Sequence, residues 1–190
     1  MTEQADALKL GWLGTGRMGA AMVRRLLTNG CDVTVYNRTA AKALPLVQLG
    51  AKAAESITDL AGCDFVFTAL STSADLISAL TGPEGLISGS ASPKIVVDCS
   101  TVSADASAIV RERLAGRGTA LLAAPVMGNP KVVEVGRMTA AVSGPVRAEM
   151  RSAGVLRAVK TMSHPARSVI DPAAFAPSST SGCALTAVRL

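Results

Sequence analysis

Short apolar runs alternate with helical patterns along most of the chain, from Leu8 to about Gly144. In the helical segments, apolar residues recur three or four positions apart and so share one face, as Met18, Met22 and Leu26 do. The runs expected to be strands are residues 8–13, 33–36, 65–70, 95–97, 121–124 and 138–142. The segments expected to be helices are residues 17–29, 39–49, 74–80 and 103–114, with Ser103 as the N-cap of the last.

This alternation predicts an α/β fold of the Rossmann type, with a doubly wound, mostly parallel sheet and helices on both faces. Residues 65–70 form a continuous apolar run, as expected for a parallel strand buried on both sides. Ligands of such sheets bind at the carboxyl ends of the strands. The ligand-binding residues are therefore expected in the segments that follow the strands.

The alternation stops at Gly144. Residues 145–190 contain four prolines and many serines and arginines, and they show little sustained periodicity. A short helix is expected at 149–160, and 165–190 are expected to be mostly disordered or poorly packed. The predicted organisation is one domain over residues 1–144, followed by a divergent, irregular and poorly ordered tail over residues 145–190.

Composition and charge exclude several classes of protein. Of the 190 residues, 49% are hydrophobic and 17% charged, which argues against intrinsic disorder. The net charge of +5 divides into +1 for residues 1–144 and +4 for the tail, and only five residues are aromatic, so nucleic acid is not an expected partner. No apolar run is long enough to span a membrane, and the N-terminus does not look like a secretory signal. The four cysteines are dispersed, which favours reduced thiols in a cytoplasmic protein and no metal site.

The strongest motif follows the first expected strand and reads Gly14-Thr15-Gly16-Arg17-Met18-Gly19. This GxGxxG pattern between a strand and a helix is typical of dinucleotide-binding turns. Gly14 would permit the tight turn, Gly16 the approach of a pyrophosphate, and Gly19 the close packing of helix on strand. The N–H groups at the start of the helix would bind the phosphates. The alternative is a glycine-rich turn without a ligand.

The second expected strand ends in Asn37-Arg38-Thr39, where an NAD-binding protein would have an acid. Arg38 can pair with a 2′-phosphate and lie against the adenine, while Asn37 and Thr39 can supply hydrogen bonds. The predicted cofactor is therefore NADP in preference to NAD. The alternative is that Arg38 is only a solvated residue at the start of a helix.

Four segments of residues 8–144 together resemble a known family: GWLGTGRMGAAMVRRLLTNGCDVTVYNRT, FVFTALSTSADL, IVVDCSTVSA and AAPVMGNPKVVEVGRMTAAVSG. They are similar to the N-terminal domain of the β-hydroxyacid dehydrogenases. That family includes 3-hydroxyisobutyrate dehydrogenase, glyoxylate/succinic semialdehyde reductases and the NADP-binding domain of 6-phosphogluconate dehydrogenase.

The resemblance implies further cofactor-binding residues. Leu70 and Ser71 match a Leu-Pro pair whose backbone lines the nicotinamide ribose side. Asp75 lies where an asparagine often contacts the cofactor, and Thr101 matches a threonine beside the nicotinamide. Alternatively, Ser100 and Thr101 simply cap the helix that follows them.

The resemblance also implies a substrate loop. Residues 125–129 match Pro-Val-Ser-Gly-Gly, which holds the substrate carboxylate, so Met127, Gly128 and Asn129 are the expected substrate-binding residues. Met127 replaces the serine and removes one hydroxyl partner. Asn129 replaces the second glycine and, because asparagine tolerates a left-handed conformation, still allows the backbone N–H groups to be presented. The alternative is an ordinary turn.

The catalytic half of the family pattern is not found. In the family, a lysine and an asparagine spaced KxxxN follow this domain, and an all-α second domain closes the site and makes most of the dimer interface. The only lysine after Gly144 is Lys160, and His164 stands where the asparagine would be. We therefore assign no catalytic residue and leave the oligomeric state open. The composition of the tail suggests a frameshift near codon 145; the alternative is genuine divergence into a short protein.

The predicted function is an NADP(H)-binding domain of a β-hydroxyacid dehydrogenase or semialdehyde reductase. Such an enzyme transfers hydride between NADP and a small carboxylate-bearing substrate, a 3-hydroxy acid or its semialdehyde. The chain is expected to be a truncated form with weak or no activity. One alternative is a non-catalytic NADPH-binding or sensing module, and another is a chain that exposes an uncovered patch and aggregates.

Overall fold

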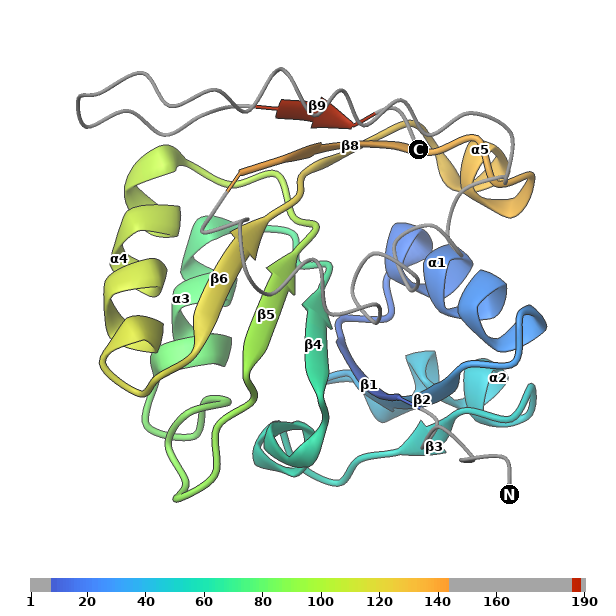
Figure 1. Cartoon of the computed structure of the whole chain (residues 1–190). Helices are drawn as coiled ribbons and strands as arrows, with labels where there is room; N and C mark the ends of the chain where they lie inside the picture. The colour runs from blue at the N-terminus through green and yellow to red at the C-terminus, as the bar shows by residue number, and fades with distance from the viewer. Residues whose placement is uncertain (1–7, 144–185, 189–190) are drawn as a thin grey trace, which may run out of the picture.

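The computed structural model describes residues 8–143 and 186–188. Six parallel strands form the main sheet in the order β3-β2-β1-β4-β5-β6 (Figure 1). Their bounds are β1 Lys9–Leu13, β2 Asp32–Tyr36, β3 Lys52–Ala53, β4 Phe65–Thr68, β5 Ile95–Asp98 and β6 Ala120–Ala123. Strand order reverses between β1 and β4, which is the switch point of a doubly wound sheet. The expected Rossmann-type fold is confirmed.

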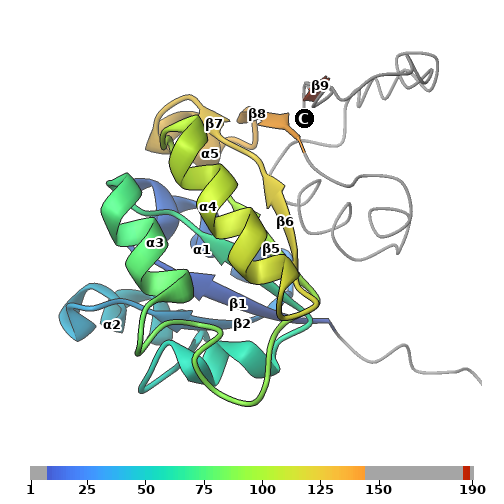
Figure 2. The same cartoon turned by 90° about the vertical axis from the view of Figure 1, so that its left-hand side faces the viewer.

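Helices cover both faces of this sheet. They are α1 Arg17–Thr28, α2 Leu44–Val47, α3 Ser73–Thr81, α4 Ala104–Ala115 and α5 Pro130–Glu134, with 3₁₀ turns η1 Ala40–Lys42 and η2 Thr58–Gly62. Figure 2 shows α3 beside α4 on one face, and α1 packs against α5 on the other. None of the helices in the described part is long and apolar enough to cross a membrane.

Each face of the sheet has its own hydrophobic core. On the α1 face, Met22 and Leu26 are fully buried, as their helical spacing predicts, and Trp12 stacks on Phe67 with ring centroids 5.5 Å apart. The α3–α4 face has a second cluster, which includes Leu76 from α3. Because the strands alternate their side chains between two apolar layers, they read as continuous apolar runs.

The helix expected over residues 39–49 is divided into η1 and α2. Pro45 lies in the first turn of α2, where the missing N–H of a proline is tolerated. The same proline would remove a hydrogen bond from the interior of a longer helix. The proline therefore begins a new helix at this point.

A second, antiparallel sheet lies beyond the carboxyl ends of the main strands. It consists of β7 Val126–Met127, β8 Thr139–Val142 and β9 Thr186–Val188, in that order (Figure 2). Only β8 was expected from the sequence. Strand β9 falls within the segment 165–190 expected to be poorly ordered; the rest of that segment and the expected helix at 149–160 lie outside the described residues. The domain boundary at residue 144 remains a prediction.

Candidate cofactor-binding site

Gly14, the first residue after β1, makes a turn that no other residue fits. Its φ is +97°, and a Cβ there would lie 2.5 Å from the carbonyl oxygen of Ala69. Its N–H donates to the carbonyl oxygen of Tyr36 at 2.9 Å, which ties the turn to the end of β2. The tight turn expected at Gly14 is confirmed.

Gly19 allows α1 to pack closely on this turn. A Cβ at Gly19 would collide with the carbonyl oxygen of Gly14 and lie 3.0 Å from Nε1 of Trp12. That Nε1 donates to the same Gly14 oxygen at 2.9 Å. The close helix–strand packing expected of the third glycine is confirmed.

Gly16 differs from the other two glycines because the space where a side chain would begin is open. It is the N-cap residue of α1, it is exposed, and no protein atom lies within 4 Å of the position a Cβ would take. No side chain caps α1, its first turn holds no acid, and Arg17 there is exposed, whereas Met18 packs partly against the core. The first N–H groups of α1 are thus available to an anionic ligand.

The hydrogen bonds of Thr15 indicate whether a dinucleotide fits this turn. Its N–H donates to Oδ1 of Asn37 at 2.9 Å, while its Oγ1 is buried and has no hydrogen-bond partner among the described residues. Nδ2 of Asn37 donates to the carbonyl oxygen of Thr39 at 3.0 Å, so Asn37 connects the turn to the segment after β2. A buried hydroxyl without a partner, beside an open helix N-terminus, fits a ligand rich in hydrogen-bond acceptors.

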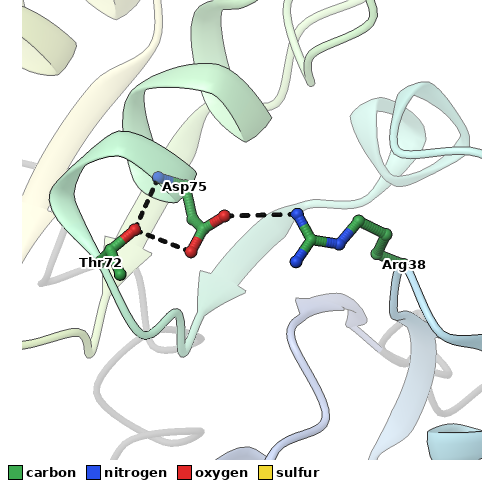
Figure 3. A network of polar contacts seen from close by, with 3 residues as sticks. All are labelled: Arg38, Thr72 and Asp75. Atoms are coloured by element: carbon green, nitrogen blue, oxygen red, sulfur yellow. Dashed lines mark hydrogen bonds and ion pairs between the residues drawn. The ribbon is translucent and has the colours of Figure 1, made fainter.

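Arg38 and Asp75 meet across the switch point, as Figure 3 shows. Nη1 of Arg38 lies 3.4 Å from Oδ1 of Asp75, with the arginine side chain 88% exposed and the aspartate side chain 37% exposed. Thr72, the N-cap of α3, donates its hydroxyl to Oδ2 of Asp75 at 2.7 Å and accepts from the Asp75 N–H at 3.0 Å. The Asp75 carboxylate is thus fixed on α3 by Thr72, whereas the Arg38 side chain is exposed and flexible.

The segments after β4 and β5 are joined at the same edge of the sheet. The N–H of Leu70 donates to Oγ of Ser100 at 2.9 Å, while Ser71 and Thr101 are exposed. Ser103 caps α4 by accepting from the N–H of Ala106 at 3.2 Å, as expected. Ser100 and Thr101 are therefore not the cap of α4.

The loop after β6 has a different geometry from the one expected. Gly128 has a φ of +134°, whereas Asn129 has an ordinary extended φ of −135°. Asn129 therefore does not adopt the left-handed conformation that asparagine tolerates; its Oδ1 accepts from the N–H of Val132 at 3.1 Å and caps α5. Met127 is 54% exposed at the end of β7. The loop is thus a strand-to-helix connection with an exposed glycine backbone.

Neither Cys99 nor Cys63 is an activated thiol, since burial raises the pKa of Cys99 well above that of an ordinary thiol and also raises the pKa of Cys63. No group of three potential metal ligands occurs within residues 8–143 and 186–188. Lys160 and His164 lie outside the described residues.

The sheet order and the glycine turn at the start of α1 define a dinucleotide-binding domain. The sequence matches the family described as the NAD binding domain of 6-phosphogluconate dehydrogenase over residues 9–166, and the chain belongs to this family. The resemblance inferred from the sequence is confirmed.

Individual relatives agree with this family. Glyoxylate/succinic semialdehyde reductase 2 of Arabidopsis thaliana is 39% identical over 135 residues, which are 70% of this chain and 38% of the reductase. The structure of Psf3 in complex with NADP+ and 2-OPP has a TM-score of 0.72 at 28% identity and is matched over 81% of this chain and 54% of that one. The 3-hydroxyisobutyrate dehydrogenase of Mycobacterium tuberculosis gives a TM-score of 0.73 at 25% identity, over 82% and 52%. This chain thus spans about half or less of each relative's length.

Proposed function

We propose that this domain binds NADP(H) and forms the cofactor half of an oxidoreductase acting on a small hydroxy acid or its semialdehyde. The observation that carries the choice of NADP is the exposed guanidinium of Arg38, two residues after β2, whose end is hydrogen-bonded to the glycine turn. The relative named a glyoxylate/succinic semialdehyde reductase and the neighbour described with NADP+ support this choice.

The adenosine half of the cofactor would lie over β1 and β2. The free N–H groups of α1 would bind the pyrophosphate, and Arg38 the 2′-phosphate. A pair of unit charges 4 Å apart is worth about 4 kcal/mol at an effective dielectric of 20, before desolvation. Because Arg38 is exposed, only part of that energy is retained, but about 1.4 kcal/mol already gives a tenfold preference.

The nicotinamide half would lie over β4 and β5, beside Leu70, Ser71 and Thr101, and the exposed backbone of Gly128 would face the substrate carboxylate. When bound, NADPH supplies the hydride; the chain's own residues hold and orient it. The proton needs a placed group, which typically contributes 10²–10⁴-fold. In the family pattern that group is the lysine of KxxxN, and Lys160 lacks the asparagine of this pattern.

We therefore propose binding with weak turnover, and a purely NADPH-binding or sensing role is the second candidate. The dispersed cysteines support a reducing compartment such as the cytoplasm.

The test is a titration of the full chain with NADPH and with NADH, followed by calorimetry. We expect tighter binding of NADPH, and Arg38→Asp should weaken NADPH about tenfold while changing NADH less than about twofold. Arg24→Asp, the same charge change at an exposed position of α1, is the control and should change neither. If the chain binds neither nucleotide, the proposed function is wrong. If Arg38→Asp weakens the binding of NADPH and NADH equally, the role of Arg38 is wrong.

An activity assay of the full chain with NADPH and succinic semialdehyde or glyoxylate distinguishes a weak reductase from a purely NADPH-binding or sensing module. Oxidation of NADPH, followed by absorbance, is expected to be far slower than the roughly 1–10³ s⁻¹ of ordinary enzymes. A rate in that range would show that the chain contains a proton donor we have not identified. Tight binding without any oxidation would favour the sensing module.

A further inference from the structure

A buried network of polar side chains joins the carboxyl ends of β4 and β5. Thr68 and Asp98, the last residues of these strands, face each other in register. Oγ1 of Thr68 donates to Oδ1 of Asp98 at 2.7 Å, and the N–H of Ser100 donates to the same oxygen at 3.0 Å. Oγ of Ser100 in turn accepts from the N–H of Leu70 at 2.9 Å.

This network is deeply buried. Thr68 is 0% exposed, Asp98 1% and Ser100 5%. Buried polar side chains are destabilising unless their hydrogen bonds are satisfied, and a fully apolar pair at the ends of two strands would serve packing alone equally well. A satisfied polar network instead fixes one arrangement of the chain. Here it fixes the two segments that leave the sheet after β4 and β5.

Those two segments lie where the second half of a dinucleotide binds. The glycine turn follows β1 and Arg38 follows β2, so the adenosine half belongs to the β1–β2 side of the switch point. A dinucleotide extends across that point, which brings its other half over the carboxyl ends of β4 and β5. Leu70 and Ser100, the residues that the network connects, are each the second residue beyond the end of their strand.

We infer that Asp98, acting through Ser100, is a positioning residue for the half of the cofactor that carries the nicotinamide. The inference rests on the proposed function. Asp98 and Ser100 hold the backbone at Leu70 and Ser100 at a fixed separation, and the cofactor's reactive end binds between segments that are already ordered. The network does not act on the adenosine half.

The test compares NADPH with 2′,5′-ADP, which has the adenosine 2′-phosphate but lacks the nicotinamide. Both are titrated against the full chain and Ser100→Ala, which removes the acceptor of the Leu70 N–H. We expect Ser100→Ala to weaken NADPH about five- to tenfold and 2′,5′-ADP less than about twofold. Asp98→Ala, which removes the acceptor of the Thr68 hydroxyl and the Ser100 N–H, should cause the same selective loss of NADPH affinity, and Asp98→Asn, which keeps an accepting oxygen, should restore most of it. Unchanged NADPH binding in Asp98→Ala would refute the role of Asp98.

Thr119→Val is the matched control. Thr119 is also buried, and its Oγ1 donates to the carbonyl oxygen of Pro93 at 2.7 Å, but it precedes β6 at the opposite edge of the sheet. It should lower stability without changing either affinity. If Ser100→Ala weakens both ligands equally or neither, or if the wild-type chain binds both ligands equally tightly, the inference is wrong. If the wild-type chain binds neither ligand, the proposed function itself fails.

Discussion

At the residue scale, Gly16 and Gly19 belong to one motif but have different physical roles. Gly19 lies against the Gly14 carbonyl oxygen, so any side chain there collides with backbone. Gly16 has a φ of −65°, which every residue can adopt, and open space where a Cβ would be. The fold therefore requires glycine at position 19, whereas at position 16 only a ligand would require it.

This difference predicts opposite effects for two similar substitutions. Gly19→Ala should lower the free energy of unfolding by about 1–3 kcal/mol, because the helix must move away from the turn. Gly16→Ala should leave that free energy within about 0.5 kcal/mol and weaken NADPH about tenfold, since the methyl group occupies the approach of the pyrophosphate. Urea denaturation and calorimetry measure the two quantities. Unchanged NADPH binding in Gly16→Ala would show that the pyrophosphate does not bind beside Gly16.

The dinucleotide-binding turn can be predicted from the sequence because the residues of its glycine motif are adjacent. The segments that follow the strands can also be predicted. The sequence does not predict the polar contacts between those segments. Thr68 and Asp98 are 30 residues apart, as are Leu70 and Ser100, and Arg38 is 37 residues from Asp75. Only the register of the strands brings them together. A polar residue that ends an apolar strand, as Asp98 does, is the single local signal for such a network.

At the element scale, the long helices agree with their predicted ranges because each has a periodic apolar face. Strands β3 and β7 have two residues each, too few for any period to be recognised. Pro45 divides the segment after β2, and β9 pairs with residues more than 40 positions away. Short elements and long-range pairings depend on tertiary contacts that local patterns do not contain.

The contact between α3 and the segment after β2 yields a further prediction. Asp75 holds Arg38 through one 3.4 Å ion pair and would lie near a phosphate bound to that guanidinium. Asp75→Asn should therefore strengthen NADPH about two- to fivefold relative to NADH, because the exposed pair is weak and its removal ends both competition and repulsion. The gain should shrink at high salt, and calorimetry at two ionic strengths measures it.

Asp105→Asn is the control for that substitution. Asp105 lies in the first turn of α4, as Asp75 does in that of α3, and loss of its charge should not change the ratio of the two affinities. Weaker NADPH binding in Asp75→Asn would mean that the carboxylate orients Arg38 for the phosphate instead of competing with it.

At the scale of the whole molecule, the two cores meet at the sheet, and the proposed site lies along its carboxyl edge. A ligand bound at that edge would contact segments from both halves of the sheet, so it would stabilise the folded domain as one unit. The stabilisation follows RT ln(1 + [L]/Kd), about 2.7 kcal/mol at roughly 100 times Kd. A probe buried in the sheet and exposed only on unfolding would measure this directly.

Cys99 is such a probe, because it follows β5, is 5% exposed and has a thiol whose pKa is raised by burial. A buried, protonated thiol does not react with maleimide, so labelling should require unfolding. We expect the labelling rate of Cys99, followed on its own peptide by mass spectrometry, to fall about a hundredfold at an NADPH concentration of roughly 100 times Kd. The half-buried Cys63 serves as an internal comparison, since it should react without global unfolding and respond less to NADPH. Rapid labelling of Cys99 that NADPH does not slow would show that β5 opens independently of the site, and the two halves of the sheet would then not unfold as one unit.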